Sequence, residues 1–214
     1  MANNYFEFKQ FTVFQDKCAM KVCTDACLLG AVIADNNRLA ANCLDIGTGT
    51  GLLSLMFAQK NSAAIIDAVE INTDAAEQAM ENIMASPWAE RIRIYKEDIL
   101  TFIPGRQYDF IFSNPPFFED DLRSPDDAKN NAKHNASLTL SGLISFADIH
   151  LNRDGFFAVL LPYHRVDHFT EEATKAGFHL TRQMLVKQTM KHTFFRGILF
   201  FKRKENKTQF SELI

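Results

Sequence analysis

The segment Asn114-Pro115-Pro116-Phe117 combines groups that could prepare an aromatic amine for attack on an electrophile. The lone pair of such an amine is delocalised into its ring, so the nitrogen is a poor nucleophile. Two acceptors holding its two N–H bonds would favour a pyramidal nitrogen. The Asn114 side-chain oxygen can accept one hydrogen bond and the Pro115 carbonyl the other, because consecutive prolines stiffen this stretch. Phe117 offers a ring on which a base can stack, worth about 1–3 kcal/mol.

The alternative for this segment is a plain proline turn followed by an aromatic core residue. Its position favours chemistry, because it follows a predicted strand over 110–113. In a mostly parallel sheet, ligands bind at the carboxyl ends of the strands. Methyl transfer suits such a site, since it depends on proximity and orientation. It needs no strong base beforehand, because the amine becomes acidic once it is methylated.

A glycine-rich segment, Asp45-Ile-Gly47-Thr48-Gly49-Thr-Gly51, follows a predicted strand over 43–46. Glycines permit a tight turn and a close approach of the backbone to a ligand. A dinucleotide-binding loop would need a third glycine at position 52, which is Leu52. The spacing G-x-G-x-G, with an acid two residues before the first glycine, resembles the first motif of the class I S-adenosylmethionine-dependent methyltransferases.

Two more acids stand where the next strands are predicted to end, Glu70 and Asp98. An acid in the position of Glu70 can accept hydrogen bonds from both hydroxyls of a ribose. The resemblance implies that Asp98 accepts from the adenine amino group of the cofactor and that Asp45 faces its ammonium group. Each acid alone could be a helix N-cap or a loop residue. Together with the glycines they predict S-adenosylmethionine as the cofactor and S-adenosylhomocysteine as its product.

Short apolar strands alternate with helical segments along the rest of the chain. Strands are predicted over 43–46, 65–71, 92–95, 110–113, 156–161, 178–186 and 193–202, and helices over 52–60, 73–85, 141–151 and 166–176. Alternation of this kind implies right-handed crossovers and a parallel sheet covered on both faces. We expect an α/β fold: a doubly wound, mostly parallel, seven-stranded Rossmann-like sheet with an antiparallel edge. The predicted domain spans 41–214, with residues 1–40 as an N-terminal extension packed on it.

Length and composition fit one soluble globular domain, since 214 residues with 47% hydrophobic and 23% charged residues support a single sizeable core. No apolar run approaches the roughly 20 residues of a membrane helix. The N-terminus lacks a secretory signal, so we expect a cytoplasmic protein. The spacing of its four cysteines does not match a zinc site, and we expect free thiols and no metal. They are Cys18, Cys23, Cys27 and Cys43.

The net charge of −3 hides a basic segment near the C-terminus, where residues 182–207 hold eight Lys and Arg against one Glu. A cationic edge on an acidic protein suits a local phosphate contact, although lysines also protect solvated strand edges. The polar stretch 119–134 is typical of a substrate clamp or of a disordered loop. We predict RNA contacts at Lys133, His134, Arg196, Lys202, Arg203 and Lys204. The nearby phenylalanines are better explained as core strand residues than as base platforms.

Several segments together resemble one family, the bacterial tRNA1(Val) (adenine(37)-N6)-methyltransferases. The resemblance covers nearly the whole chain, through 8–13, 19–31, 44–55, 114–117, 133–135 and 194–199. The sequence differs from the usual family pattern at Cys23 and Ala26, where glycine is usual, and at Lys133, where arginine is usual. The first two changes keep small residues. Lysine at 133 keeps the charge but lacks the two parallel N–H donors of arginine, which weakens a phosphate contact there.

The resemblance implies methyl transfer to the exocyclic N6 amino group of an adenine in the anticodon loop of valine tRNA, by a monomer. Two alternatives stay open: an N5-glutamine methyltransferase of a release factor, and an N6-adenine methyltransferase acting on another RNA. The first would normally carry a long N-terminal helical bundle, for which the residues before Asp45 leave little room. Catalysis is assigned to Asn114, Pro115, Pro116 and Phe117. The predicted cofactor site comprises Lys21, Thr24, Asp25, Asp45, Gly47, Thr48, Gly49, Gly51, Glu70, Ile71, Asp98, Ile99 and Asn114.

Overall fold

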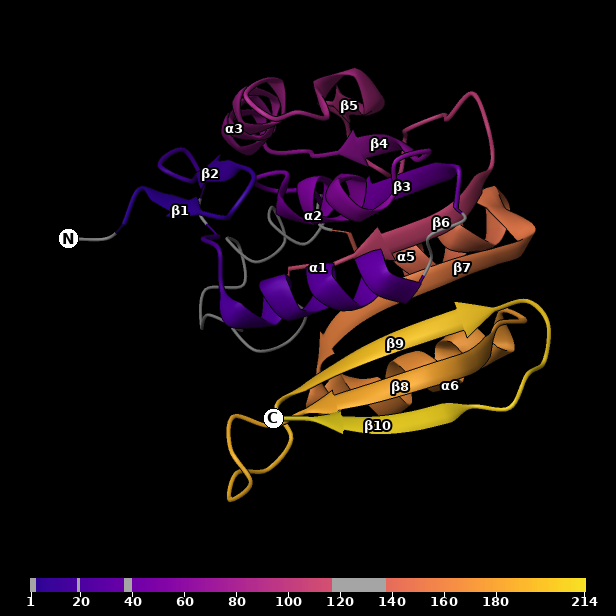
Figure 1. Cartoon of the computed structure of the whole chain (residues 1–214). Helices are drawn as coiled ribbons and strands as arrows, with labels where there is room; N and C mark the ends of the chain where they lie inside the picture. Colours follow the sequence, from indigo (N-terminus) through magenta and orange to yellow (C-terminus); the bar gives the residue numbers. More distant parts are fainter. Residues whose placement is uncertain (1–2, 19, 37–39, 117–137) are drawn as a thin grey trace, which may run out of the picture.

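One eight-stranded sheet organises the molecule, with the strand order β10-β8-β9-β7-β6-β3-β4-β5 (Figure 1). The computed structural model describes residues 3–18, 20–36, 40–116 and 138–214. Within the sheet β9 runs antiparallel to its neighbours β7 and β8, and every other neighbouring pair is parallel. The strands are β3 (Asn42–Ile46), β4 (Ile65–Val69), β5 (Ile92–Tyr95), β6 (Tyr108–Ser113), β7 (Leu151–Pro162), β8 (His179–Val186), β9 (Arg196–Lys202) and β10 (Gln209–Leu213).

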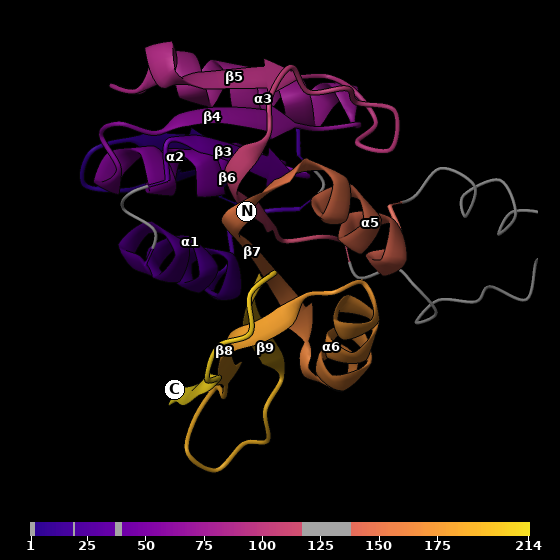
Figure 2. The same ribbon diagram turned by 90° about the vertical axis from the view of Figure 1, so that its right-hand side faces the viewer.

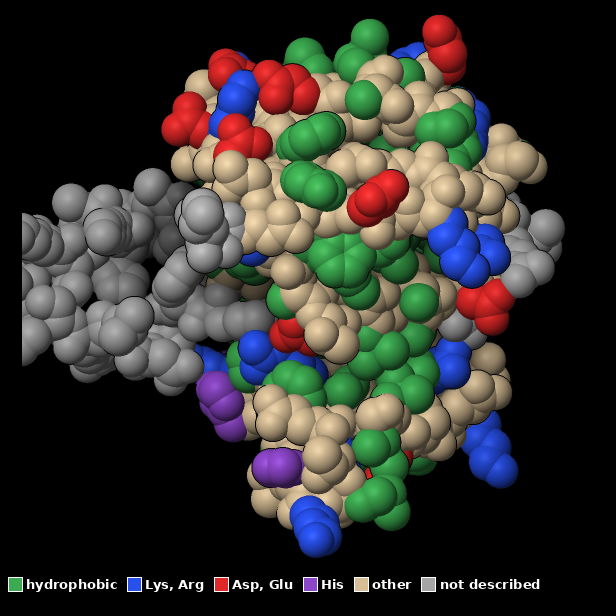
Figure 3. Space-filling view, turned by 60° about the vertical axis from the view of Figure 1, so that its left-hand side comes forward, with side chains coloured by type: hydrophobic (Ala, Val, Ile, Leu, Met, Phe, Trp, Pro, Cys, Tyr) green, Lys and Arg blue, Asp and Glu red, His purple; other side chains and the backbone are tan. Residues whose placement is uncertain are grey.

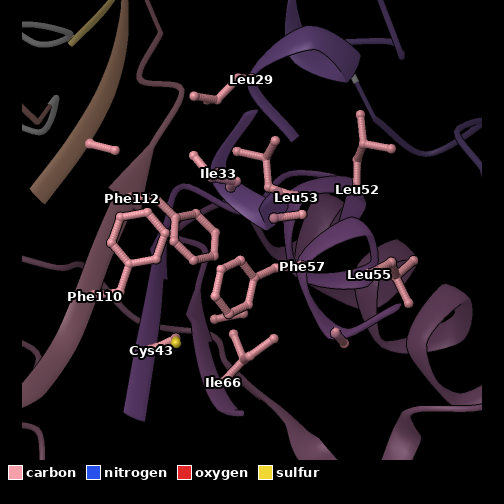
Figure 4. Close-up of a cluster of buried hydrophobic side chains, with 14 of the residues drawn as sticks. Leu29, Ile33, Cys43, Leu52, Leu53, Leu55, Phe57, Ile66, Phe110 and Phe112 are labelled. Atoms are coloured by element: carbon pink, nitrogen blue, oxygen red, sulfur yellow. The ribbon is translucent and has the colours of Figure 1, made fainter. Parts of the chain in front are cut away.

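Side chains of the central strands alternate between two apolar cores, one on each face of the sheet. Phe110 and Phe112 of β6 enter the core under the first helices, while Ile111 between them enters the opposite core. Both faces are therefore apolar, which explains why these strands are nearly continuous hydrophobic runs in the sequence. In the first core, Phe57 packs against both Phe110 and Phe112 with ring centroids 5.5 Å apart in each pair (Figure 4).

The helices divide between the two faces (Figure 2). The first core lies under α1 (Thr24–Asn36), α2 (Leu52–Lys60) and α3 (Thr73–Met84), and the second under α5 (Leu140–His150) and α6 (Val166–Lys175). Helices α1 and α2 approach closely at Gly30, where a Cβ would lie 2.3 Å from the Met56 sulfur. No helix in the described ranges is both long enough and apolar enough to cross a membrane.

The N-terminal residues form a small hairpin of β1 (Tyr5–Glu7) and β2 (Thr12–Phe14), which packs beside α3. Phe11 is buried against the edge of the Trp88 ring, with centroids 5.5 Å apart. Asn82 of α3 is almost completely buried and bonds the hairpin through the backbone of Phe14, its Oδ1 accepting at 2.9 Å and its Nδ2 donating at 2.8 Å. The same Nδ2 donates to the carbonyl of Thr50, which ties the hairpin to the glycine loop.

The predicted α/β fold is confirmed, but the sheet holds eight strands where seven were expected. The additional strand, β10, has the sequence Gln-Phe-Ser-Glu-Leu and pairs in parallel with β8 at the edge. Its burial is slight, so it lacks the apolar signal of a core strand. The predicted strand 156–161 is also longer, because β7 begins at Leu151 with the polar residues Asn152, Arg153 and Asp154. Residues 24–36, to which no element was assigned, form α1.

Candidate active site

The glycine loop turns the chain sharply between the end of β3 and the start of α2. Gly47, Gly49 and Gly51 have φ values of +71°, +56° and +81°, a region that other residues rarely adopt. The amide of Gly47 donates to the carbonyl of Val69 at 2.9 Å, and this bond fixes the loop against the end of β4. A Cβ at Gly47 or Gly49 would meet no atom within 4 Å, so space is open beside the loop.

Asp45 lies under this loop and is fully buried. Its Oδ2 accepts hydrogen bonds from the hydroxyls of Thr48 and Ser54, each at 2.7 Å. Its Oδ1 is also buried and has no hydrogen-bond partner in the described part of the chain. Burial raises the pKa of Asp45 to about 6, although the hydroxyls of Thr48 and Ser54 counteract it. An unpartnered buried carboxylate oxygen is costly, so this atom suits a cationic donor from a ligand.

Glu70, directly after β4, holds the loop from the other side. Its Oε2 accepts from the Gly49 amide and its Oε1 accepts from the Asn72 amide, both at 2.9 Å. Each carboxylate oxygen has a second lone pair, so both can still accept from hydroxyl groups of a ligand. The residue therefore shapes the loop and keeps capacity to bind the two hydroxyls of a ribose.

We expect the substitution Glu70→Ala to weaken binding of S-adenosylhomocysteine about 10- to 100-fold, because two charge-assisted hydrogen bonds disappear and the loop loses its anchor. Isothermal titration calorimetry measures the affinity. Glu77→Ala is the matched control: Glu77 bonds Lys96 at 3.0 Å on the surface of α3, so its loss removes the same charge away from the loop. Equal affinities in wild type and Glu70→Ala would exclude Glu70 from the cofactor site.

Asp98, in the turn after β5, uses one carboxylate oxygen within that turn and has the other available for a ligand. Its Oδ1 accepts from the Leu100 amide at 2.9 Å. Its Oδ2 forms no hydrogen bond within the described part of the chain. The two neighbouring isoleucines differ, since Ile71 is 54% exposed and Ile99 only 5%. Ile71 is therefore free to contact a ligand, whereas Ile99 belongs mainly to the second core.

Asn114 follows the end of β6, beside the end of β3. The Ser113 hydroxyl donates to the Ile46 carbonyl at 2.8 Å and joins the ends of these two strands. The Asn114 Oδ1 is buried and, like Asp45 Oδ1, has no hydrogen-bond partner among the described residues. Because Ile46 and Ser113 are register partners, these two orphaned oxygens lie on neighbouring strands at the same edge of the sheet. Pro115 is buried and Pro116 exposed, while Phe117 lies outside the described residues.

The start of α1 reaches the same edge through an ion pair. The Arg196 guanidinium, at the start of β9, donates to Asp25 Oδ2 at 2.8 Å. Burial alone would raise the pKa of Asp25, but hydrogen bonds from Cys23 and Arg196 and the Arg196 charge lower it below its usual value. Lys21 and Thr24, predicted to line the methionine end of the cofactor, are exposed near this helix start. Arg196, predicted as an RNA contact, therefore has a structural partner.

Three of the other predicted RNA contacts lie away from this edge. Strand β9 ends at Lys202, which pairs with His179 at the start of β8, and Arg203 and Lys204 follow it (Figure 1). Arg203 bonds Asp148, Lys204 bonds Asp154, and the Lys202 ammonium lies 3.8 Å from the Phe156 ring centre. Their contact with RNA stays a prediction, and so does that of Lys133 and His134, which lie outside the described residues.

Sequence reasoning missed two positioning side chains of this site, Ser54 and Asn82. Ser54 lies on α2 and shares the Asp45 carboxylate with Thr48. Asn82 lies with Gln78 on the buried side of α3, one helical turn apart. A pair of amides at that spacing on the apolar side of a helix is the signal that could have found it, because buried amides need partners. No group of three or more potential metal ligands occurs among the described residues.

Comparisons with known proteins agree with this architecture. The solved structures that resemble the chain include a putative class I S-adenosylmethionine-dependent methyltransferase from Listeria monocytogenes. Its TM-score is 0.65 at 13% identity, covering 94% of this chain and 67% of that one. A putative RNA methyltransferase from Pyrococcus horikoshii gives a TM-score of 0.60 at 19% identity, covering 86% and 83%. The fold is thus that of the class I methyltransferases.

The sequence comparisons define the family more narrowly. Residues 18–160 match the model of the methyltransferase small domain. A protein named tRNA1(Val) (adenine(37)-N6)-methyltransferase from Dyadobacter fermentans is 46% identical over 205 residues, covering 95% of this chain and 84% of its own. One of the same name from Citrobacter koseri is 40% identical over 206 residues, covering 94% and 82%. The chain belongs to the family of these tRNA methyltransferases.

Proposed function

We propose that the protein transfers a methyl group from S-adenosylmethionine to the N6 amino group of adenine 37 in the anticodon loop of valine tRNA, the reaction named for its relatives. The single observation that carries the proposal is Asn114 Oδ1, which follows the end of β6, precedes two prolines and has no hydrogen-bond partner in the described ranges. A buried amide oxygen without a donor costs about 1–3 kcal/mol. An amino group of the substrate satisfies it.

The residues at the carboxyl edge fit the cofactor group by group. Asp45 Oδ1 would accept from the ammonium, Glu70 from the ribose hydroxyls and Asp98 Oδ2 from the adenine amino group. The glycine loop supplies backbone without Cβ atoms beside the ligand, and Lys21, Thr24 and Asp25 border its methionine end. When bound, S-adenosylmethionine supplies a methyl group on a positively charged sulfur.

The residues of this chain hold and orient the base during the reaction. Asn114 Oδ1 accepts from one N–H of the adenine amino group and the Pro115 carbonyl accepts from the other, which favours a localised lone pair on the nitrogen. Phe117 stacks on the base. Transfer would form the nitrogen–carbon bond as the bond between that carbon and the sulfur breaks, leaving S-adenosylhomocysteine, and the alkylated nitrogen would release its proton to water. An anticodon-loop base is weakly stacked, so displacing it into the site requires little energy compared with flipping a duplex base.

The rest of the molecule supports this chemistry as a single catalytic domain over 41–214, on which residues 1–40 pack. The contacts of Asn82 with Phe14 and Thr50 support this division, because they connect the extension to the glycine loop. A tRNA substrate places the enzyme in the cytoplasm, and we expect it to act as a monomer.

The proposal predicts incorporation of labelled methyl groups into an unmodified valine tRNA transcript, and none into a transcript with guanine in place of adenine 37. Scintillation counting of the precipitated RNA measures both. Equal label in the two transcripts would move the target to another nucleotide. Label in neither transcript, but in a release factor included as a third substrate, would replace the proposal with glutamine methylation.

A further inference from the structure

Aromatic and basic side chains meet where β7 and β8 end and β9 begins. Tyr163 directly follows β7, and its amide donates to the Phe195 carbonyl at 3.1 Å. Its ring lies 5.4 Å from that of Phe194, and the Lys187 ammonium lies 4.2 Å from the centre of the Phe194 ring. We call this the β8–β9 surface; it comprises Tyr163, Lys187, Met190, Lys191, His192 and Phe194.

The β8–β9 surface lies at the same edge of the sheet as the candidate active site. Strand β7 runs parallel to β6, so Tyr163 and Asn114 both follow the carboxyl ends of neighbouring strands. Arg196 pairs with Pro162 in the sheet and reaches Asp25 at the start of α1, which fixes the surface to the predicted mouth of the site. The β8–β9 surface is therefore close enough to the site to contact a nucleic acid whose base enters it.

Much of the surface is exposed and its charge is positive. Met190 is 77% exposed and Tyr163 43%, and Lys191 and His192 are also exposed. No acidic residue occurs in 187–195 or in 162–165. Glu212 bonds Lys187 at 3.0 Å, whereas Lys191 has no ion pair within the described part of the chain.

The charge of this side of the molecule is divided (Figure 3). Its upper part shows mostly acidic side chains, and the exposed acids of α3 include Asp74 as well as Glu77 and Glu81, which pair with Lys96 and Lys17. Its lower part, toward β8 and β9, shows basic side chains and histidines around a hydrophobic area. A polyanion that approaches this side of the molecule is attracted to the part near β8 and β9 rather than to the part near α3.

We infer that the β8–β9 surface binds the anticodon stem-loop of the substrate, with Lys187 and Lys191 on backbone phosphates and Tyr163 stacked on an unpaired base. This inference rests on the proposed function and adds where the RNA lies. Single-stranded RNA is recognised through splayed bases stacked on aromatic rings, and phosphates supply most of the affinity. The surface offers both kinds of contact, whereas Lys202, Arg203 and Lys204 lie at the opposite edge.

The test measures fluorescence anisotropy of a labelled valine anticodon stem-loop over a series of salt concentrations. The double variant Lys187→Ala/Lys191→Ala is expected to bind about tenfold more weakly at low salt, with the slope of log K against log salt less negative by about 1.4. Tyr163→Ala is expected to lose about fivefold or more in affinity with an unchanged salt slope, because it removes stacking rather than charge.

The matched control is Lys60→Ala/Lys175→Ala, which removes the same charge at the C-terminal ends of α2 and α6, away from the carboxyl ends of the parallel strands, and is expected to leave affinity and slope unchanged. Loss of affinity in the control, with none in Lys187→Ala/Lys191→Ala, would overturn the inference. S-adenosylhomocysteine affinity, measured alongside, is expected to be equal in all variants and serves as the check on folding.

Methyl transfer by the wild type to the same RNA separates the two proposals. If the wild type methylates the RNA while Lys187→Ala/Lys191→Ala and Tyr163→Ala bind it as tightly as the wild type, the inference is overturned and the proposed function stands. Neither methylation nor binding by the wild type overturns both.

Discussion

The substitution Asn114→Ala is expected to lower kcat for methyl transfer about 100- to 1,000-fold, while the affinity for S-adenosylmethionine changes less than about twofold. The magnitude follows from the loss of one preorganised hydrogen bond to a reacting group. The separation follows from the position of Asn114 Oδ1, whose unpartnered state suits a substrate donor. Single-turnover methylation and calorimetric cofactor binding measure the two quantities.

Asn114→Asp is the conservative control for this substitution. It keeps an acceptor oxygen at the same place, so we expect it to retain more activity than Asn114→Ala. Asn114→Ala should unfold at a temperature similar to that of the wild type, because Asn114 Oδ1 has no partner to lose among the described residues. A folded Asn114→Ala protein without cofactor affinity would show that Asn114 holds the cofactor rather than the amine.

The second large effect concerns Asp45 and pH. Burial raises the pKa of its carboxyl to about 6. If Asp45 holds the cofactor as proposed, the ammonium pairs with the ionised carboxylate and binding competes with the proton. We expect the affinity for S-adenosylmethionine to be constant well above pH 6 and to fall as pH drops through 6, approaching tenfold per pH unit. Calorimetry from pH 5 to pH 8 measures this profile.

Asp45→Asn removes both the charge and the titration. We expect its affinity at pH 7.5 to be about 100-fold lower than that of the wild type, since one partner of a buried charged pair is lost. Between pH 5 and pH 7 it should stay flat. The control ligand is 5′-methylthioadenosine, which lacks the ammonium and should bind both proteins equally at every pH. A wild-type profile that is retained in Asp45→Asn would assign the titration to another group.

The positions of the site residues along the chain were predictable because strand and helix alternate regularly here. Each acid was expected at the end of a strand, and Glu70 follows the last residue of β4 directly. Fully buried strands such as β6 give strong apolar runs, and their ends are marked where polar residues resume. The confirmed family also agrees with the resemblance drawn from the flanking motifs.

The placement of the basic residues was not predictable in the same way. Arg196 and Lys202 are six positions apart, yet they lie at opposite edges because β9 spans the sheet between them. Counting charges along the sequence therefore grouped basic residues that lie far apart in the folded protein. Arg196 pairs with Asp25, 171 positions away in the sequence, and no local sequence pattern predicts a contact over that separation. Strand β10 was missed because its side chains are mostly exposed.

The central claim is that the exocyclic amine of adenine is the group methylated. Its most direct test is digestion of the reacted valine tRNA to nucleosides, followed by liquid chromatography and mass spectrometry against authentic standards. We expect one new methylated nucleoside, which elutes with N6-methyladenosine and, after the same reaction time, is about 100-fold or more less abundant with Asn114→Ala than with the wild type. A product that elutes instead with 1-methyladenosine or 2-methyladenosine would contradict the role given to Asn114 and Pro115, since neither product is alkylated at the exocyclic nitrogen.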